Sequence, residues 1–149
     1  KFGVAEKGGT GMNREELKKI MPHREPMLLI DEAELKDENL AVGKYTVKGD
    51  EFFLQGHFPG NPIVPGVIQC EILAQTCCVL LADRVKGHTP LFGGLEKVRF
   101  KNQVKPGDTL VLECSLTRSA PVLLCEGKRD GQRETGGQRG TVVRLNLKS

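Results

Sequence analysis

Residues 67–85 read VIQCEILAQTCCVLLADRV and contain neither Gly nor Pro. If this stretch is wound as an α-helix, apolar side chains occur on almost every side of it. A helix of this kind is buried over most of its surface, so other segments must surround it. We therefore expect the rest of the chain to wrap around this one helix.

Short segments with the composition of β-strands lie on both sides of this helix in the sequence. They are residues 27–33, 39–48, 94–104, 109–117, 121–126 and 141–147. No βαβ repeat is present, so a doubly wound parallel sheet is disfavoured. The sequence predicts an α+β fold in which a curved, mostly antiparallel sheet wraps around one long buried helix.

Local signals predict several boundaries. Asn13 followed by Glu16 has the spacing of a capping box and predicts a first helix that ends near Pro22. Gly43 interrupts an alternating segment and suggests a β-bulge. The sequence Pro-Gly-Asp at 106–108 predicts a turn between two strands. Residues 127–140 are charged and rich in Gly, which predicts a mobile loop.

The overall composition excludes several classes of protein. The chain has 149 residues, 38% hydrophobic and 28% charged, which fits one folded domain. A net charge of +3, no Trp and one Tyr argue against a nucleic-acid-binding protein. No apolar run is long enough to span a membrane. We interpret residues 1–11 as the remnant of a tag or leader and residues 12–149 as the domain.

The five cysteines form no CxxC pair, and their number is odd. This pattern argues against a zinc site and against a disulfide framework. Three of the five occur in the apolar helix, where a free Cys behaves as a small hydrophobe. We expect reduced cysteines in a reducing compartment.

His57 lies in a loop, residues 51–66, that contains three Pro and three Gly. Such a loop follows a fixed path and can hold an imidazole in one place. A neutral imidazole is a competent general base near neutral pH. A lone His is more often structural, but this setting makes His57 the first catalytic candidate.

Glu71 is the second candidate, because it is a carboxyl group on the apolar helix. A Glu in this position is paired, protonated or facing a cleft. Burial raises the pKa of a carboxyl, which suits a general acid, although Glu71 could instead belong to a buried hydrogen-bond network with Gln75. Gly66 begins the helix, and its free N–H could hold a developing oxyanion. His23 is a second histidine candidate, although a role in ordering the turn between the first helix and the first strand is favoured.

Positive charge is concentrated in residues 83–105, which hold six basic and two acidic residues. Lys97, Arg99 and Lys101 alternate and could share one face of a strand. This segment is either a solvated strand face or a docking surface for an acidic partner.

Four stretches share their pattern with one known family. They are MPHR at 21–24 with MLLID at 27–31, GHFPGNPIVPGV at 56–67, EILAQ at 71–75 and KVRF at 97–100. Together they resemble the (3R)-hydroxyacyl-[acyl carrier protein] dehydratases of type II fatty acid synthesis. The resemblance implies a hot-dog fold and a dimer whose sheets join, commonly assembled as a trimer of dimers. It also implies active sites shared between two chains.

The resemblance assigns roles to individual residues. His57 takes the C2 proton, Glu71 protonates the departing C3 hydroxyl, and the N–H of Gly66 polarises the thioester carbonyl. Phe58 or Phe92 closes an acyl tunnel. The acidic acyl carrier protein docks on Lys97, Arg99 and Lys101. No metal or redox cofactor, nucleic acid or membrane is required, and the compartment is a bacterial-type cytoplasm or a plastid-type organelle.

Other functions remain open at this point. A bifunctional dehydratase and isomerase of the related family usually has Asp where Glu71 stands. A hot-dog thioesterase or a non-catalytic binder of acyl chains would use the same scaffold. Residues 119–140 are richer in Arg, Gln and Gly than the family pattern, which places the last hairpin in doubt.

Overall fold

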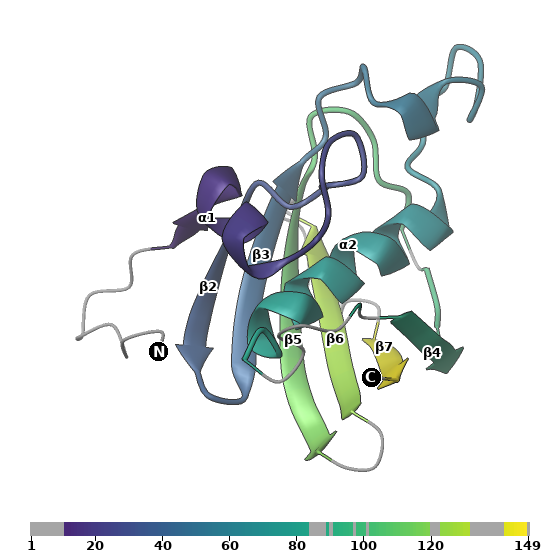
Figure 1. Cartoon of the computed structure of the whole chain (residues 1–149). Helices are drawn as coiled ribbons and strands as arrows, with labels where there is room; N and C mark the ends of the chain where they lie inside the picture. Colours follow the sequence, from purple (N-terminus) through teal and green to yellow (C-terminus); the bar gives the residue numbers. More distant parts are fainter. Residues whose placement is uncertain are drawn as a thin grey trace.

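An antiparallel sheet curves around helix α2 (Gly66–Leu80) in the computed structural model of this chain (Figure 1). The structure describes residues 11–83, 89, 91–96, 98–100, 102–119, 123–131 and 142–148. In these parts the sheet has seven strands in the order β1-β2-β3-β5-β6-β7-β4. The strands are β1 (Met12–Asn13), β2 (Glu32–Asp37), β3 (Leu40–Thr46), β4 (Leu91–Glu96), β5 (Thr109–Ser119), β6 (Leu123–Gly131) and β7 (Val142–Lys148).

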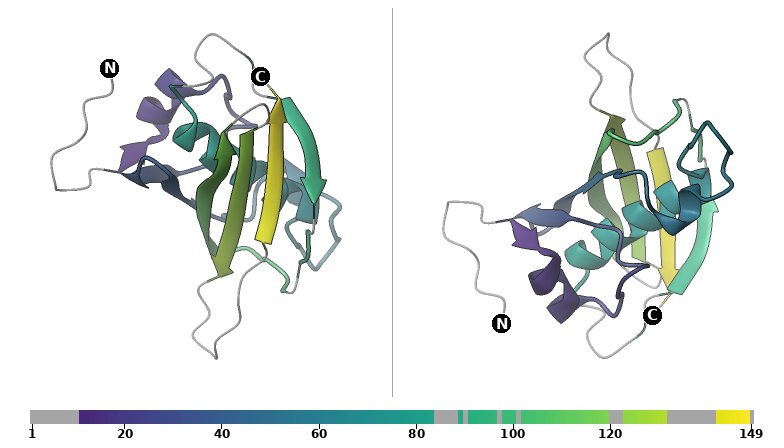
Figure 2. Two further views of the ribbon diagram at one scale, coloured as in Figure 1. Left: turned by 90° about the horizontal axis from the view of Figure 1, so that it is seen from below. Right: turned by 90° about the horizontal axis from the view of Figure 1, so that it is seen from above.

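The long helix α2 packs against one face of the sheet. Figure 2 shows α2 lying across that face and β7, in yellow, between β6 and β4. Every residue of α2 from Gln69 to Val79 is buried except Glu71. The predicted α+β architecture, with one buried helix inside a curved antiparallel sheet, is therefore confirmed.

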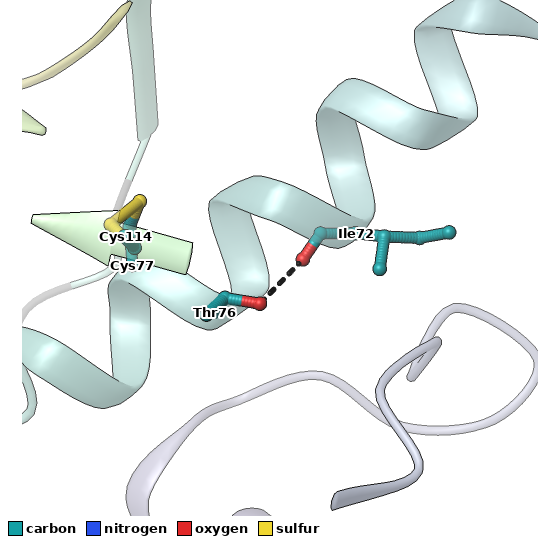
Figure 3. The surroundings of a disulfide bond; sticks show 4 residues. All are labelled: Ile72, Thr76, Cys77 and Cys114. Atoms are coloured by element: carbon teal, nitrogen blue, oxygen red, sulfur yellow. Dashed lines mark hydrogen bonds between the residues drawn. A yellow bond between two sulfur atoms is a disulfide. The ribbon is translucent and has the colours of Figure 1, made fainter. Parts of the chain in front are cut away.

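Helix α2 approaches the sheet closely at Gly43 in β3. A Cβ atom added at Gly43 would collide with Oγ1 of Thr76, which donates a hydrogen bond to the carbonyl of Ile72 at 3.2 Å (Figure 3). The predicted bulge at Gly43 is wrong, because this residue pairs regularly with Ala33 and Leu112. Glycine is required here by the close approach of the helix.

A disulfide joins Cys77 of α2 to Cys114 of β5 (Figure 3). Both residues are fully buried, and their Cα atoms lie 5.6 Å apart. The expectation that the cysteines form no disulfide is therefore wrong. The packing of the helix on the sheet brings together two thiols that are 37 residues apart in the sequence. Cys70 and Cys78 are free and buried.

The N-terminal segment follows the local signals. Helix α1 (Arg14–Ile20) begins with a complete capping box between Asn13 and Glu16, as predicted. The predicted strand at 27–33 is wrong, since the strand β2 begins only at Glu32. Residues 28–30 are buried outside the helices and strands, and the N–H of Leu29 is bound by the side chain of Gln75 in α2. The apolar character of this segment therefore reflects burial and not sheet pairing.

Two later boundaries differ from prediction, and one predicted turn is confirmed. Strand β4 ends at Glu96, so the predicted strand over 94–104 is shorter and begins earlier. Strand β6 continues to Gly131 through part of the predicted loop at 127–140, and residues 132–140 lie outside the described residues. The turn at 106–108 is confirmed, with Gly107 at a φ of 90° that favours glycine.

Candidate active site

The loop before α2 holds His57 through its backbone and its ring. The N–H of Ile63 donates to the carbonyl of His57 at 2.8 Å, and Phe58 and Asn61 exchange two further backbone hydrogen bonds. Nδ1 of the His57 ring lies 2.9 Å from the carbonyl oxygen of Ile63. Since a carbonyl can only accept, Nδ1 carries the proton in the neutral ring and Nε2 is left as the basic nitrogen.

Phe58 lies against the imidazole of His57. The two rings are stacked, with centroids 4.3 Å apart and planes inclined by 22°. Phe58 is 54% exposed in the single chain. It therefore covers one face of the imidazole ring and leaves its own outer face open.

Gly66 is the first residue of α2, directly after the N-cap residue Pro65. The first N–H groups of a helix have no acceptor within it, so they are free to bind a ligand oxygen. A Cβ atom added at Gly66 would come within 2.6 Å of the ring of Phe100. The aromatic ring thus reaches the start of the helix because residue 66 has no side chain.

Glu71 is held by two nitrogen donors at one carboxyl oxygen. Nε2 of Gln75 donates to Oε1 of Glu71 at 2.9 Å, and Nε2 of His23 lies 3.3 Å from the same oxygen. The Glu71 side chain is 20% exposed. The hydrogen bond from His23 lowers the pKa of Glu71; burial raises it, and the hydrogen bond from Gln75 lowers it further. The net direction is down, so the expectation that Glu71 has a raised pKa is wrong, because the donors around the carboxyl outweigh its burial.

Gln75 connects Glu71 to the irregular segment before β2. Its Oε1 accepts the N–H of Leu29 at 2.9 Å, and its Nε2 donates to the carbonyl of Met27 at 2.7 Å as well as to Glu71. The Gln75 side chain is fully buried. The network expected around Glu71 and Gln75 is therefore present, and it extends to residues 27–29.

His23 is a site residue whose role the sequence analysis missed. The structure places it against Glu71, which lies 48 positions later (71 − 23). Its Nδ1 atom is buried and has no hydrogen-bond partner among the described residues. No local spacing indicates this contact, since the turn and the helix are brought together only by the fold. The described interactions do not join His57 to Glu71.

Comparison with known proteins identifies the family. The family model of the ApeI-like dehydratases matches residues 33–133. A 3-hydroxyacyl-[acyl-carrier-protein] dehydratase of Clostridium beijerinckii is 50% identical over 112 residues, which are 72% of this chain and 79% of the relative. The chain belongs to the 3-hydroxyacyl-[acyl-carrier-protein] dehydratase family. A dehydratase of Natranaerobius thermophilus with the same name is 41% identical over 135 residues, 89% of this chain and 93% of the relative.

Solved structures agree with this family on the fold. A structure described as the dehydratase heterocomplex ApeI:P from Xenorhabdus doucetiae aligns with a TM-score of 0.72 at 22% identity, covering 89% of both chains. The Escherichia coli PaaI protein aligns with a TM-score of 0.59 at 16% identity, covering 77% of this chain and 79% of that one. At these identities the likeness concerns the fold alone, and it confirms the hot-dog architecture.

Of the other residues predicted for this dehydratase site, the structure describes the side chain of Arg99 but not those of Phe92, Lys97 and Lys101. Arg99 is exposed in an irregular segment after β4, so the predicted strand shared with Lys97 and Lys101 is wrong at this position. Lys97 and Lys101 lie outside the described residues. Phe92 belongs to β4, and its side chain lies outside the described part of the structure.

The described part of the chain contains neither a metal-binding cluster nor a membrane-spanning helix. No three His, Cys, Asp or Glu side chains in the described ranges are grouped so that they could hold a metal ion. Within the same part of the chain, no helix has the length and apolar character needed to cross a membrane.

Proposed function

We propose that this chain removes water from (3R)-hydroxyacyl thioesters of an acyl carrier protein and forms trans-2-enoyl thioesters in fatty acid biosynthesis. The family and the names of the relatives support this reaction. The observation that carries the proposal is the contact of Nδ1 of His57 with the carbonyl of Ile63 at 2.9 Å. It leaves Nε2 as a base on a loop with a fixed backbone.

In the proposed reaction, Nε2 of His57 takes the proton from C2 of the acyl chain. The electron pair of the C2–H bond forms the C2–C3 double bond, and the C3–O bond breaks. Glu71 protonates the departing hydroxyl, which leaves as water. The N–H of Gly66 donates to the thioester carbonyl and stabilises the negative charge that develops there.

The lowered pKa of Glu71 makes its carboxylic acid a stronger proton donor. It also means that the single chain at neutral pH holds Glu71 mainly as carboxylate. Bound acyl chain and a second protein surface would remove water from the carboxyl, and this further desolvation favours its protonated form. We therefore place the productive protonation state in the substrate complex.

We propose that the active site is completed by a second copy of the chain, with His57 from one copy and Glu71 from the other. One exposed apolar side chain beside each residue supports this arrangement. Phe58, which stacks on His57, is 54% exposed, and Val67, four positions before Glu71 on α2, is 73% exposed in the single chain. Large exposed apolar groups mark surfaces that another molecule covers. Three such dimers would form the hexamer expected from the resemblance.

The acyl carrier protein docks on Lys97, Arg99 and Lys101, and Phe58 or Phe92 closes the acyl tunnel. The relatives from Clostridium beijerinckii and Natranaerobius thermophilus are bacterial, which supports a bacterial-type cytoplasmic location.

The test is a dehydration assay with a (3R)-hydroxyacyl-[acyl carrier protein], following the enoyl product and its double-bond position. We expect His57→Ala and Glu71→Gln each to reduce kcat by roughly 100-fold or more, because each loses one proton-transfer group. Circular dichroism and gel filtration check that fold and assembly are kept. A wild-type chain without activity, or a fully active Glu71→Gln variant, would overturn the proposal.

A further inference from the structure

The two oxygens of the Glu71 carboxyl differ in their surroundings. Oε1 accepts a hydrogen bond from Nε2 of Gln75 at 2.9 Å, and Nε2 of His23 lies 3.3 Å from the same atom. None of the hydrogen bonds or ion pairs that the structure describes involves Oε2. One oxygen is therefore held by the protein, and the other is available to a substrate.

The buried Nδ1 atom of His23 indicates which tautomer the ring adopts. An N–H at Nδ1 would be buried without an acceptor among the described residues, which costs more than a bare lone pair at the same place. The proton of the neutral ring is therefore on Nε2, the atom that faces Glu71. In this tautomer His23 donates to Oε1.

The turn that carries His23 is held rigidly by Arg24. Nη1 of Arg24 donates to the carbonyls of Met21 and His23, at 3.0 and 2.7 Å, and Nη2 donates to the carbonyl of Lys18 at 3.2 Å. A guanidinium that binds three carbonyls fixes the backbone on both sides of residue 23. The imidazole is therefore presented to α2 by a fixed support.

Other charged groups near this turn are engaged elsewhere. Glu25 lies within ion-pair distance of Lys18 and Arg14, at 3.1 and 3.6 Å. Arg14 also contacts Asp31 at 3.0 Å. Among the described side chains, Glu71 of α2 is the charged group that faces the imidazole of His23.

We propose that His23 is a positioning residue for Glu71, which holds Oε1 so that Oε2 delivers the proton to the departing hydroxyl. This inference rests on the proposed function and adds to it a residue from the segment between α1 and β2. When Oε2–H gives its proton to the hydroxyl, the C3–O bond breaks and the carboxyl becomes a carboxylate. The charge is then stabilised by the N–H groups of His23 and Gln75 at Oε1.

The inference predicts different outcomes for two polar replacements of His23. The amide nitrogen of Gln can occupy the position of the imidazole Nε2, whereas the amide of Asn is too short to reach it. We expect His23→Asn to lower kcat by roughly 10- to 100-fold with little change in KM, because Glu71 is misplaced while substrate contacts remain. His23→Gln should restore most of kcat.

Glu25→Gln is the matched control, because it changes a side chain of the same turn that does not contact Glu71. It should keep the kcat of the wild type. Thermal unfolding of all variants checks that the turn and the fold are kept. Equal kcat values for His23→Asn, His23→Gln and the wild type would overturn the inference, and so would equal losses in both His23 variants.

A second readout does not depend on activity. In chain labelled with ¹³C at the Glu carboxyl carbons, NMR titration follows Glu71 directly, with Glu71→Gln identifying its signal. Loss of the His23 donor in His23→Asn should raise the pKa of Glu71, and His23→Gln should reverse part of that rise. An unchanged titration in His23→Asn would contradict the inference. An inactive wild type with the expected titration shift would instead contradict the proposed reaction alone.

Discussion

Gln75 and Leu29 lie 46 residues apart in the sequence, and Oε1 of Gln75 accepts the N–H of Leu29 at 2.9 Å. The same side chain donates to the carbonyl of Met27 and to Glu71. One amide side chain thus makes three hydrogen bonds, two with the backbone of the irregular segment before β2 and one with the candidate acid. The segment is bound to α2 without being part of the sheet.

Replacing Gln75 by Leu should destabilise the fold. The buried N–H of Leu29 would lose its acceptor, which costs about 1–3 kcal/mol. The carbonyl of Met27 and the carboxyl of Glu71 would each lose a donor as well. Chemical denaturation of Gln75→Leu measures this loss. The exposed Gln103 provides the control, since Gln103→Leu should change stability by less than about 0.5 kcal/mol. Equal stability of the two variants would mean that the bonds of Gln75 contribute little.

The disulfide between Cys77 and Cys114 should stabilise the chain strongly. It closes a loop of 37 residues, for which the chain-entropy estimate is about 4 kcal/mol. We expect a loss of this order in urea denaturation of Cys77→Ala, and no further loss when dithiothreitol is added to that variant. Cys70→Ala, which removes a free buried thiol, should lose less and remain sensitive to dithiothreitol. Identical behaviour of the two variants would argue against the bond.

Gly66 and Phe100 should be coupled energetically. An added Cβ at residue 66 meets the ring at 2.6 Å, so Gly66→Ala forces the ring or the start of α2 to move. We expect Gly66→Ala to cost about 1–3 kcal/mol of stability. In the Phe100→Ala background the same change should cost much less, because the clash is gone. A double-mutant cycle measures this difference, and additive effects would show that the contact is unimportant.

The pKa of Glu71 predicts how stability depends on pH. Its folded-state pKa is lowered from 4.5. A lowered carboxyl pKa contributes stability above the unfolded-state value, and that contribution is lost as the pH falls through the folded-state value. Below a pH of about 4.5, the unfolding free energy of Glu71→Gln should therefore decrease less steeply with falling pH than that of the wild type. Urea denaturation at several pH values measures this dependence. Glu38→Gln, at an exposed position, should show the same pH dependence of the unfolding free energy as the wild type.

Docking of the carrier protein should depend on Arg99. If this exposed cation contacts an acidic partner, Arg99→Glu will raise KM for an acyl-carrier-protein substrate and weaken the salt dependence of kcat/KM. A small pantetheine thioester carries no protein, so its KM should be unchanged in this variant. Parallel steady-state assays with both substrates check the expectation. A similar rise in KM for both would indicate damage to the acyl site.

Local patterns determined the elements that carry the candidate chemistry. The capping box at Asn13 and Glu16 began α1, and the apolar run without Gly or Pro became α2. The rigid loop around His57 was predictable from its Gly and Pro residues. These features depend on residues within one or two turns of each other, so they are encoded in short stretches of sequence.

Tertiary structure alone decided the contacts between those elements. The approach of α2 to the sheet forms the disulfide from Cys77 to Cys114. The segment after α1 packs against α2 and brings His23 to Glu71. Burial alone would raise the pKa of this carboxyl, but the contact with His23 lowers it. Such contacts join residues far apart in the sequence, and a carboxyl pKa depends on every donor that the fold places beside it. The apolar pattern could show that Glu71 lies on a buried helix, but only the folded chain shows which donors surround its charge.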